Sequence, residues 1–500
     1  MARKRGLNHW LKILPSWPAW LITLLIIVIF LRIPSLFYPY SYGDQGIYLT
    51  LGQAIRQGVV LYREIHDNKP PLLYLLAAIS GSLAWFQALL LIWSLGTILV
   101  FWRLAKCLFA NQSRPVLLST LLLALLTTWP RLEGQVANAE IFMILPIIAG
   151  FLLILSGKKR EKLRFFAAGI LFSLGVLFKV PAGFDFGAAL IFLFFLFFSQ
   201  KKKDYSLLIA RYSLLIFGFL TPILLSSFFF TLQGALPHFL QAGFLQNIGY
   251  LSSWKGKTHA GVMVSSGFLL RAGSLLVVTF LLWLFRKKLN KNLIFLSLWL
   301  IFSLFGATLS ERPYPHYLIQ VLPSASLLAG LFLAKIKKIE RLIIIFFLGL
   351  FLIAHQYFNF WQYPTIPYYQ NFLSWATRQK TTQEYLQYFN SHLPQNYQLA
   401  SFLHQNTSPQ DRVFIWGEDA PCLYALARHL PPGRYTANYH IKDFNGYQET
   451  LEAIKAVRPK FIVILSRKDS FPQLEEFLAS QYFQLGEIAG ALLYFPLPPK

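Results

Sequence analysis

Long apolar runs, separated by short polar or basic stretches, fill the first 357 residues of the chain. Most of these runs approach the roughly 20 residues that a helix needs to cross a bilayer. The pattern therefore predicts about eleven membrane-spanning helices. In chain order they cover residues 18–34, 87–102, 115–129, 139–156, 165–178, 184–199, 206–230, 264–285, 293–309, 317–334 and 342–357.

Beyond residue 357 the chain is more polar and its apolar runs are shorter. Three of them, at 413–416, 461–465 and 491–495, have the length and composition of buried strands. Between them, 445–457 and 471–480 repeat apolar residues at helical spacing. Strands alternating with helices predict a small α/β domain.

This change of pattern divides the chain into three parts. We expect a transmembrane domain at 1–357, a linker with a helical segment at 358–394, and the α/β domain at 395–500. The first outer loop, about 35–84, is long, and we expect its apolar second half to form helices lying at or dipping into the membrane interface. A second long outer loop, 231–263, could form a mobile flap; its notable residues are Pro237, His238, Trp254, Lys255, Lys257 and His259.

Composition and charge support a membrane protein. Hydrophobic residues make up 55% of the chain and charged residues 13%, so the chain is too apolar for one soluble core. The net charge of +25 does not indicate a nucleic-acid partner, because the basic residues cluster in every second loop between the spans. These loops contain, among others, Arg103, Lys106, Arg160, Lys162, Lys201, Lys202, Lys287, Lys288, Lys337 and Lys338.

This distribution follows the positive-inside rule, and it predicts the orientation of the protein. The N-terminus lies in the cytoplasm and the α/β domain lies outside. The first apolar run resembles a signal peptide, but no small-residue cleavage pattern follows it, so we expect a retained helix. Cys107 and Cys422 fall on opposite sides and cannot pair. We expect a multi-pass protein of a bacterial inner (plasma) membrane, in contact with anionic lipid.

Isolated ionisable residues stand beside the outer ends of several predicted helices. Asp44 follows the first span, Glu140 begins the fourth, Lys179 ends the fifth, and Arg312 and His316 precede the tenth. A charge at the membrane edge is costly unless it is paired or hydrated, so such residues are candidates for function. For Asp44, which has a glycine on each side of its short motif, an ordinary Gly-Asp turn is an equal alternative.

The sequence Lys69-Pro70-Pro71 adds a specific geometry. Proline suits the first turn of a helix, so Lys69 is expected at a helix start, where free N–H groups also favour an anion. This is a plausible phosphate site, although a loop lysine before a helix is the plain alternative.

Together the outer loops offer carboxylates and cations suited to moving a group from a phosphate to a hydroxyl or amine. The carboxylates are Asp44, Glu140 and Asp67; the cations are Lys69, Lys179, Arg312 and His316. A carboxylate can take the acceptor proton, while cations stabilise charge on the departing phosphate. A divalent ion such as Mg²⁺ or Mn²⁺ could share the second task, with Asp44 and Glu140 as its ligands. No cluster has zinc spacing, and there is no Walker loop.

These motifs and their order resemble the GT-C type membrane glycosyltransferases, a group that includes protein O-mannosyltransferases and the lipid A aminoarabinose transferase. The resemblance rests on short motifs spread over essentially the whole chain. They are Asp44 with Tyr48, residues 58–62, His66-Asp-Asn-Lys-Pro-Pro71, Asn138-Ala-Glu140, Lys179-Val-Pro181, residues 312–317 with Pro323, and Asp411-Arg-Val-Phe-Ile-Trp-Gly417 with Pro421, Leu423 and Tyr424.

The resemblance implies a donor sugar carried on a polyprenyl phosphate, an extracytoplasmic acceptor, and inversion at the anomeric carbon. It implies that Asp44 is the catalytic base or binds the acceptor. Lys69, Lys179 and Arg312 would bind the donor phosphate. Glu140, which stands where the family often has aspartate, would assist acceptor or metal binding.

Further substrate-binding candidates are weaker. His66, Asp67, His316 and Tyr317 belong to the same motifs, although a histidine at a helix end is often only a satisfied polar group. In the α/β domain, Trp416, Glu418 and Tyr424 could contact sugar, and for Trp416 packing within the domain is the favoured interpretation.

Two alternative functions remain at this point. A transporter or flippase for a lipid-linked saccharide would place ionisable or helix-breaking residues near the middle of spans and show an internal repeat. The isolated charges lie at helix ends and no two halves look alike, which favours the enzyme. An envelope polymerase or ligase would differ mainly in moving a larger glycan.

Overall fold

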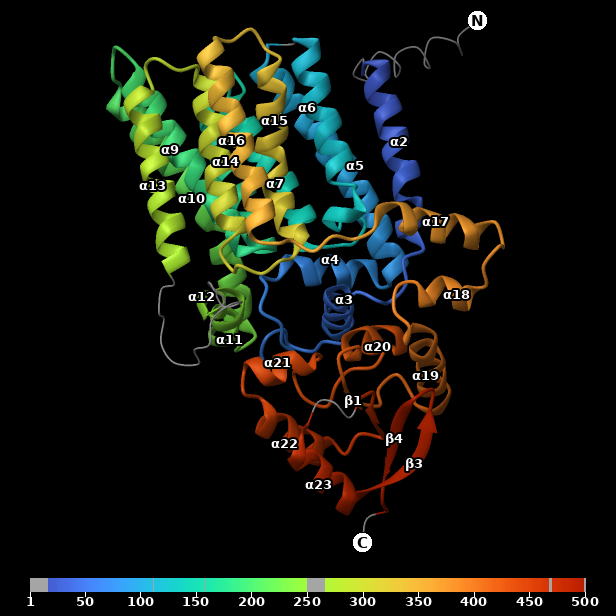
Figure 1. Ribbon diagram of the computed structural model, residues 1–500. Coiled ribbons are helices and arrows are strands. Elements are labelled where there is room, and N and C mark those ends of the chain that lie inside the picture. Colours follow the sequence, from blue (N-terminus) through green and yellow to red (C-terminus); the bar gives the residue numbers. More distant parts are fainter. Residues whose placement is uncertain (1–16, 111, 158, 250–265, 467–469, 499–500) are drawn as a thin grey trace, which may run out of the picture.

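A bundle of long helices stands on a smaller α/β domain in the computed structural model (Figure 1). The structure describes residues 17–110, 112–157, 159–249, 266–466 and 470–498. Several helices lie across the lower end of the bundle, between it and the domain. The polypeptide passes from the bundle to the domain through two short helices at one side, α17 (Thr365–Ala376) and α18 (Thr382–Gln387).

Each of the predicted spans overlaps a helix of the bundle. In chain order these are α2 (Ala19–Leu36), α5 (Leu83–Leu108), α6 (Ser113–Leu126), α7 (Ala139–Leu155), α8 (Glu161–Phe178), α9 (Gly183–Ser199), α10 (Tyr205–Leu232), α13 (Ser266–Phe285), α14 (Lys291–Ala307), α15 (Leu322–Phe332) and α16 (Lys338–Tyr357). Among the described residues, six helices are long and apolar enough to cross a membrane, and four more are shorter but apolar. The expected polytopic helical architecture is therefore confirmed.

One predicted span is divided in the structure. The run at 317–334 forms a 3₁₀-helix, η4 (Pro315–Gln320), followed by the shorter α15. Pro323 stands at the first turn of α15, where proline favours the start of a new helix. The separate η4 carries His316, whose side chain is buried.

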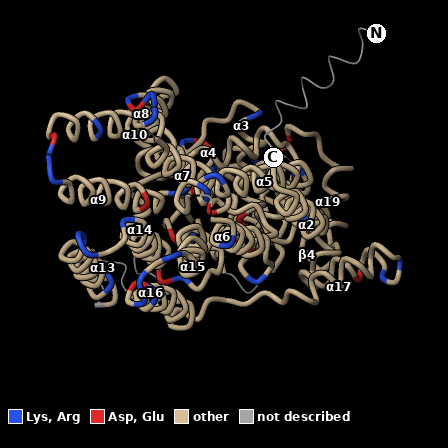
Figure 2. The backbone as a smooth tube through the Cα atoms, turned by 90° about the horizontal axis from the view of Figure 1, so that it is seen from above, with Lys and Arg blue, Asp and Glu red and all other residues tan. Residues whose placement is uncertain are grey.

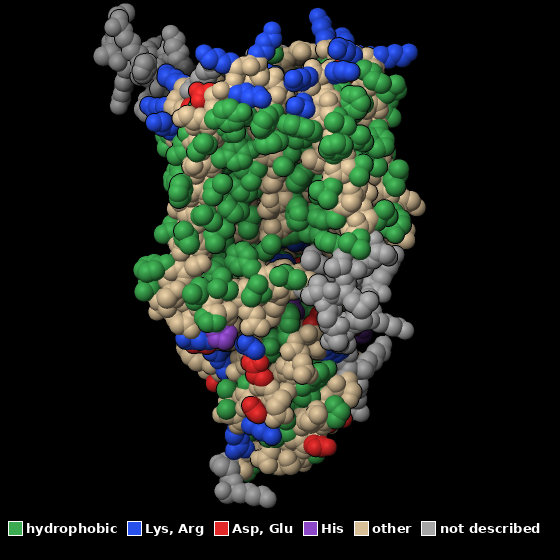
Figure 3. Space-filling view, turned by 90° about the vertical axis from the view of Figure 1, so that its left-hand side faces the viewer, with side chains coloured by type: hydrophobic (Ala, Val, Ile, Leu, Met, Phe, Trp, Pro, Cys, Tyr) green, Lys and Arg blue, Asp and Glu red, His purple; other side chains and the backbone are tan. Residues whose placement is uncertain are grey.

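The surface of the bundle matches a bilayer. Apolar side chains cover its flank, as on α13, where Leu269, Leu270 and Leu276 are exposed (Figure 3). Lysine and arginine gather at the end of the bundle remote from the α/β domain, in the loops that join its helices (Figures 2 and 3). This is the distribution expected of a cytoplasmic face.

Two helices of the first outer loop lie beneath the bundle (Figure 1). They are α3 (Gly43–Arg56) and α4 (Leu72–Ser80). The Gly43-Asp44 pair does not form a simple turn, because Asp44 stands in the first turn of α3. Nearby are α11 (Leu236–Leu240), the π-helix η3 (Gln241–Leu245) and α12 (Gln246–Gly249). Of the flap predicted at 231–263, residues 250–263 with Trp254, Lys255, Lys257 and His259 lie outside the described residues.

The α/β domain is built on a four-stranded sheet of order β1-β2-β4-β3. Strands β1 (Val413–Trp416) and β2 (Phe461–Ile464) are parallel, and β4 (Ala491–Pro496) pairs antiparallel with β2 and with β3 (Tyr482–Ile488). The other helices are α19 (Leu393–Asn406), α20 (Ala420–Ala427), α21 (Asn438–Asp443), α22 (Tyr447–Val457) and α23 (Pro472–Gln481).

Three of these strands were predicted, and β3 was not. Strand β3 is an exposed edge strand that contains Gly486 and a register shift, so its sequence lacks a continuous apolar run. Trp416 is buried among Tyr447 and Phe471, which confirms the packing interpretation for this residue. The Tyr424 hydroxyl accepts a hydrogen bond from the Ile415 backbone N–H, so it is also a core residue.

The α/β domain packs directly onto α3. A Cβ on Gly46 would lie 2.6 Å from the carbonyl carbon and oxygen of Pro421 at the start of α20, so glycine alone permits this approach. Further along, Gln53 Nε2 donates a hydrogen bond to the Arg428 carbonyl at 2.6 Å. The His66 N–H donates to the Arg434 carbonyl at 2.8 Å. The helix that carries Asp44 is thus held between the bundle and the domain.

Candidate functional site

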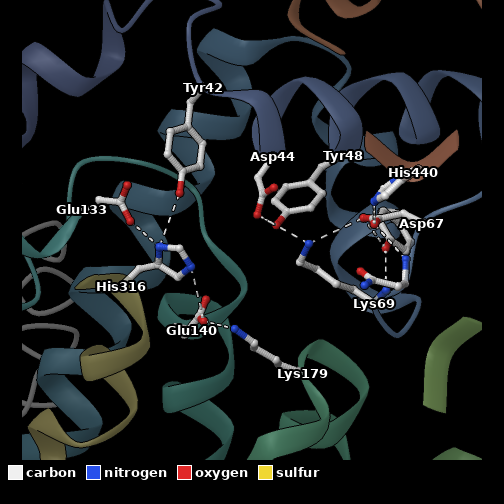
Figure 4. A network of polar contacts seen from close by, with 12 residues as sticks. Tyr42, Asp44, Tyr48, Asp67, Lys69, Glu133, Glu140, Lys179, His316 and His440 are labelled. Carbon is white, nitrogen blue, oxygen red and sulfur yellow. Dashed lines mark hydrogen bonds and ion pairs between the residues drawn. The ribbon is translucent and has the colours of Figure 1, made fainter. Parts of the chain in front are cut away.

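A cavity of about 850 Å³ lies between the α/β domain and the ends of the helices nearest to it. Its walls come from segments far apart in the sequence: the start of α3, the turn before α4, the start of α7, the turn after α8, the loop from α14 to η4, and α21. Figure 4 shows that their polar side chains point toward one another. Asp44, Lys69, Glu140, Lys179, Arg312, His316 and Tyr317, all predicted from the sequence, line this one cavity.

Asp44 and Lys69 meet in the cavity. The Lys69 ammonium lies 3.5 Å from Asp44 Oδ2 and 3.7 Å from Asp67 Oδ2, so it stands between two carboxylates. Asp44 Oδ2 also accepts a hydrogen bond from the Tyr48 hydroxyl at 2.9 Å, because residues four apart share one face of α3. Asp44 keeps 30% of its side chain exposed, whereas Asp67 is fully buried, so Asp44 is the one open to a substrate.

This surrounding sets the charge of Asp44. Burial alone would raise the pKa of its carboxyl, but the positive charges of Lys69 and His316 outweigh burial and hold that pKa below its ordinary value. Asp44 is therefore ionised at neutral pH.

Asp67 supports Lys69 from behind. Its carboxylate accepts hydrogen bonds from the Tyr74 hydroxyl and from the Asn68 N–H, both at 2.8 Å. The Tyr74 hydroxyl in turn accepts a bond from the Lys69 N–H at 3.1 Å. These contacts fix the turn before α4, and they leave Lys69 two residues ahead of the helix-capping Pro71 rather than inside the helix.

A second acid and base pair stands on the opposite wall. Glu140, buried in the first turn of α7, forms an ion pair with Lys179, which caps the end of α8. The Lys179 ammonium also lies 3.9 Å from the centre of the Tyr317 ring, a cation–π contact. The backbone beyond Lys179 is held by Gln320, whose side-chain N–H donates to the Pro181 carbonyl at 3.0 Å.

His316 connects this pair to a residue that the sequence did not single out. Its Nδ1 contacts the buried carboxylate of Glu133, and its Nε2 lies 3.8 Å from Glu140 Oε1. Burial disfavours the imidazolium, but the two carboxylates outweigh this and raise the pKa of His316 above its ordinary value. The Tyr42 hydroxyl lies 3.4 Å from the same Nδ1.

The position of Glu133 depends on distant contacts. Its backbone has φ of +56°, and the adjoining turn is tied to α2 by Arg32, which donates to the carbonyls of Gly134 and Thr127 at 2.9 Å. An isolated carboxylate in a short outer loop was the signal available in the sequence, and it does not reveal this conformation.

Arg312 lines the cavity from the loop between α14 and η4. That loop is fixed at both sides of Arg312. Glu311 pairs with Arg271 of α13 at 2.8 Å, and the Pro313 carbonyl accepts a hydrogen bond from the Trp361 N–H at 2.8 Å.

Two of the predicted substrate-binding residues, His66 and Asp67, do not line the cavity, and one of its walls was not predicted. His66 does not line the cavity; its ring packs against Tyr435 and Phe444 of the α/β domain. Asp67 acts behind Lys69 instead of at the surface. The unforeseen wall is α21, which brings Tyr439, His440 and Asp443 to the cavity, with His440 Nε2 at 3.5 Å from Asp67 Oδ1.

The remaining wall of the cavity is apolar. It includes Phe244, Ile248, Phe268, Phe305 and Leu309, next to the polar groups just described. Figure 3 shows a hollow at the lower edge of the apolar band, where charged side chains are visible. The cavity can therefore accept a molecule that is charged at one end and apolar at the other.

The carboxylates of the cavity are arranged around cationic side chains. Within the described ranges, no group of three or more His, Cys, Asp or Glu side chains is arranged to hold a metal. Asp44 and Glu140, the expected ligands, each face a lysine ammonium. The chemistry available is that of carboxylates and fixed cations.

Comparison with known proteins identifies the fold. No protein-family model and no curated protein matches the chain. The solved structure of ArnT from Cupriavidus metallidurans bound to undecaprenyl phosphate is similar, with 13% identity and a TM-score of 0.57, over 96% of this chain and 99% of that one. ArnT in the apo state gives a TM-score of 0.54 with the same identity and coverage.

A third likeness is weaker. The oligosaccharyltransferase of Archaeoglobus fulgidus in the apo form has 13% identity and a TM-score of 0.47, over 90% of this chain and 70% of that one. The two ArnT structures suffice to show that this chain has the GT-C type membrane fold, as the sequence resemblance predicts.

Proposed function

We propose that this protein is a membrane glycosyltransferase that moves a sugar from a polyprenyl-phosphate donor to an extracytoplasmic acceptor. The observation that carries the proposal is the single cavity in which an ionised carboxylate, several cations and an apolar wall meet at the outer end of the bundle. The undecaprenyl phosphate bound to ArnT, which shares this fold, is a ligand with the matching chemistry.

The donor suits both sides of the cavity. Its polyprenyl chain is apolar, like the wall formed by Phe244, Phe268 and Phe305. Its negatively charged phosphate is attracted to the positive charges of Lys69, Lys179 and Arg312. When the bond between the anomeric carbon and the phosphate oxygen breaks, the phosphate gains negative charge. Fixed cations in a partly dry cavity stabilise that charge in the transition state.

Asp44 is the proposed base. The acceptor hydroxyl attacks the anomeric carbon opposite the departing phosphate, its oxygen forms the new glycosidic bond, and its proton passes to Asp44. The configuration therefore inverts. A carboxylate of low pKa is sufficient, because the hydroxyl becomes strongly acidic as its bond to an oxocarbenium-like carbon forms.

Glu140, His316 and Glu133 have a positioning role in this proposal. Glu140 holds the Lys179 ammonium, and His316 joins Glu140 to Glu133. This chain of alternating charges fixes Lys179 against the Tyr317 ring on the donor side of the cavity.

The geometry favours an enzyme over a flippase. In the described part of the spans, the buried Arg, Asp and Glu side chains lie near helix ends, away from the middle of the bilayer: Arg32 in α2, Glu140 in α7, Asp185 in α9 and Glu340 in α16. Asp185 accepts hydrogen bonds from Trp299, Ser303 and Gln320 at 2.6 to 2.8 Å, so it is a satisfied structural group.

The test is Asp44→Asn in the purified full-length protein. We expect sugar transfer from a matched lipid-phosphate sugar to fall by at least about 10³-fold, while folding and undecaprenyl phosphate binding persist, since general-base catalysis contributes about 10²–10⁴-fold. Glu475→Gln, an exposed carboxylate on α23, is the matched control. Undiminished transfer by Asp44→Asn would exclude Asp44 as the base.

A further inference from the structure

A second, smaller cavity of about 300 Å³ lies between the first outer loop, the α11–α12 region and the α/β domain. We propose that this cavity binds one neutral sugar ring of the acceptor. The acceptor would then be a glycan or glycolipid of at least two sugars. The inference rests on the proposed transferase function, and it names the class of acceptor.

Three segments build the small cavity. The first outer loop contributes Tyr62 and His66. The other lining residues are His238, Gln241, Ala242 and Gln246 from the α11–α12 region, and Arg434, Tyr435 and Phe444 from the α/β domain. Since all three segments are needed, the cavity exists only when the α/β domain is docked.

Three polar atoms in its wall have no hydrogen-bond partner among the described residues, and one of them, Arg434 Nε, lies in an ion pair with Glu449. His66 is 3% exposed, and its Nε2 is buried with no hydrogen-bond partner; the same holds for Oε1 of Gln246. Buried polar atoms in native proteins are nearly always hydrogen-bonded, because leaving one unpaired costs about 1–3 kcal/mol. Both residues line the cavity, so a bound ligand can supply the missing partners.

The lining fits a neutral sugar better than an anion. Burial, with the nearby charge of His440, lowers the pKa of His66 to about 3, so its ring is uncharged. The Arg434 guanidinium is already paired with Glu449 at 2.7 Å. What remains is two imidazoles, of His66 and His238, and two amides, of Gln241 and Gln246, which both donate and accept as sugar hydroxyls require.

The aromatic residues and the volume of the small cavity also suit a sugar ring. Phe444 is partly exposed and, beside Tyr435, offers an apolar face for the C–H face of a pyranose, while the Tyr62 ring is packed against Phe230 and Phe239. A volume of about 300 Å³ corresponds to roughly ten water molecules at about 30 Å³ each, which is room for one sugar ring and little more.

The buried side chains of His66, His440 and Asp67 lie between this cavity and Asp44. The His66 and His440 rings lie 6.0 Å apart, and His440 contacts Asp67, which lies beside Lys69. Lys69 then contacts Asp44. An acceptor that occupies both cavities must pass around these side chains, so the sugar ring in the small cavity is not the one that reacts at Asp44.

The experiment is a binding measurement on the full-length protein in lipid nanodiscs. Methyl glycosides of glucose, galactose, mannose and N-acetylglucosamine are titrated by ligand-observed NMR. We expect at least one to bind with Kd of about 1–10 mM, and we expect Gln246→Met and His66→Phe each to weaken it at least about tenfold. Gln405→Met, an exposed glutamine on α19, should leave it unchanged.

The outcomes separate this inference from the proposed function. Binding of undecaprenyl phosphate checks that each variant is folded, and if His66→Phe does not fold, Gln246→Met decides. The inference is overturned if no methyl glycoside binds, if binding is unaffected by the variants that fold, or if methyl glucuronide binds more tightly than every neutral glycoside. Glycoside binding without sugar transfer in any assay would retain the pocket and remove the transferase.

Discussion

Lys69 is shared between an open and a buried carboxylate, and this sharing predicts a pH effect. In the Lys69→Met variant, Asp44 loses the nearest charge that lowers its pKa, so burial dominates and the pKa rises. The base is then protonated at a higher pH. We expect kcat/KM to fall at least about tenfold and the acidic limb of its pH profile to move upward.

The measurement is sugar transfer between pH 4 and 8 with saturating acceptor. Lys455→Met, an exposed lysine on α22, serves as control and should keep both the rate and the profile of the wild type. An acidic limb that stays in place in Lys69→Met would contradict the coupling between the two residues.

His316 predicts a pH dependence of stability. Its pKa in the folded protein lies above the ordinary value of 6.5, so the folded state binds this proton more tightly than the unfolded state. The stabilisation is complete below pH 6.5 and is lost as the pH rises through the folded pKa. We expect Tm of the wild type to fall over that range, and Tm of His316→Gln to fall less.

Thermal unfolding in detergent from pH 5 to 9 tests this, with the wild type minus variant difference as the readout. His392→Gln, in a loop of the outer region, is a matched substitution and should follow the wild type. A difference that grows with rising pH would reverse the predicted sign.

For single residues, the sequence was enough to find the site residues that stand next to helix ends. Asp44, Glu140 and Lys179 could be found because a charge at the membrane edge is conspicuous among apolar residues. Glu133 and His440 could not, since each reaches the cavity through packing between distant segments. His66 was assigned to the same site as Lys69 from proximity in sequence, but the turn between them directs the two side chains to different cavities.

Among the elements, the contact between α3 and α20 is the one most sensitive to a single methyl group. Gly46→Ala places a Cβ against the Pro421 backbone, which cannot move aside like a flexible side chain. We expect a loss of about 1–3 kcal/mol in stability, the range for overpacking, together with reduced transfer because α3 carries Asp44.

Gly43→Ala is the matched control for stability. It lies three residues away in the same helix, and its Cβ would meet nothing within 4 Å. Both variants gain the same helix propensity, so the difference in Tm between them isolates the contact. Equal Tm values would show that α20 does not press on α3.

Elements with a strong apolar period were predictable, and the short polar helices were not. The spans each carry a long apolar run, and strands β1, β2 and β4 each contain a short one that is largely buried. Helix α21 has only six residues and meets the turn before α4 through a tertiary contact between His440 and Asp67, so no local sequence pattern predicts it.

For the whole molecule, the segregation of basic residues predicts how the protein is oriented. We propose that the basic end faces the cytoplasm and that the α/β domain faces outward (Figure 3). In a Cys107→Ser background, a membrane-impermeant maleimide added to intact cells should label Lys460→Cys in the α/β domain and leave Lys202→Cys unlabelled until the cells are opened. The reverse labelling would invert the topology and move the cavity to the other side.

The overall architecture could be predicted because only a few kinds of structure can span a bilayer. Apolar length, basic loops and one change of composition were enough to indicate a helical bundle with an outer α/β domain. How the domain docks was hidden, because glycine contacts such as that of Gly46 and backbone hydrogen bonds such as that to Arg434 leave no periodic signal.

The packing of α20 on α3 also bears on how the protein is made. Asp44 is synthesised early, but its helix gains its partner only after the segment around Pro421 has been translated and translocated. At about 5–20 residues per second, the roughly 400 intervening residues take about 20–80 s. Through that interval the helices of the bundle have already been made, but the cavity is incomplete. A chain truncated before α20 would remain in that incomplete state.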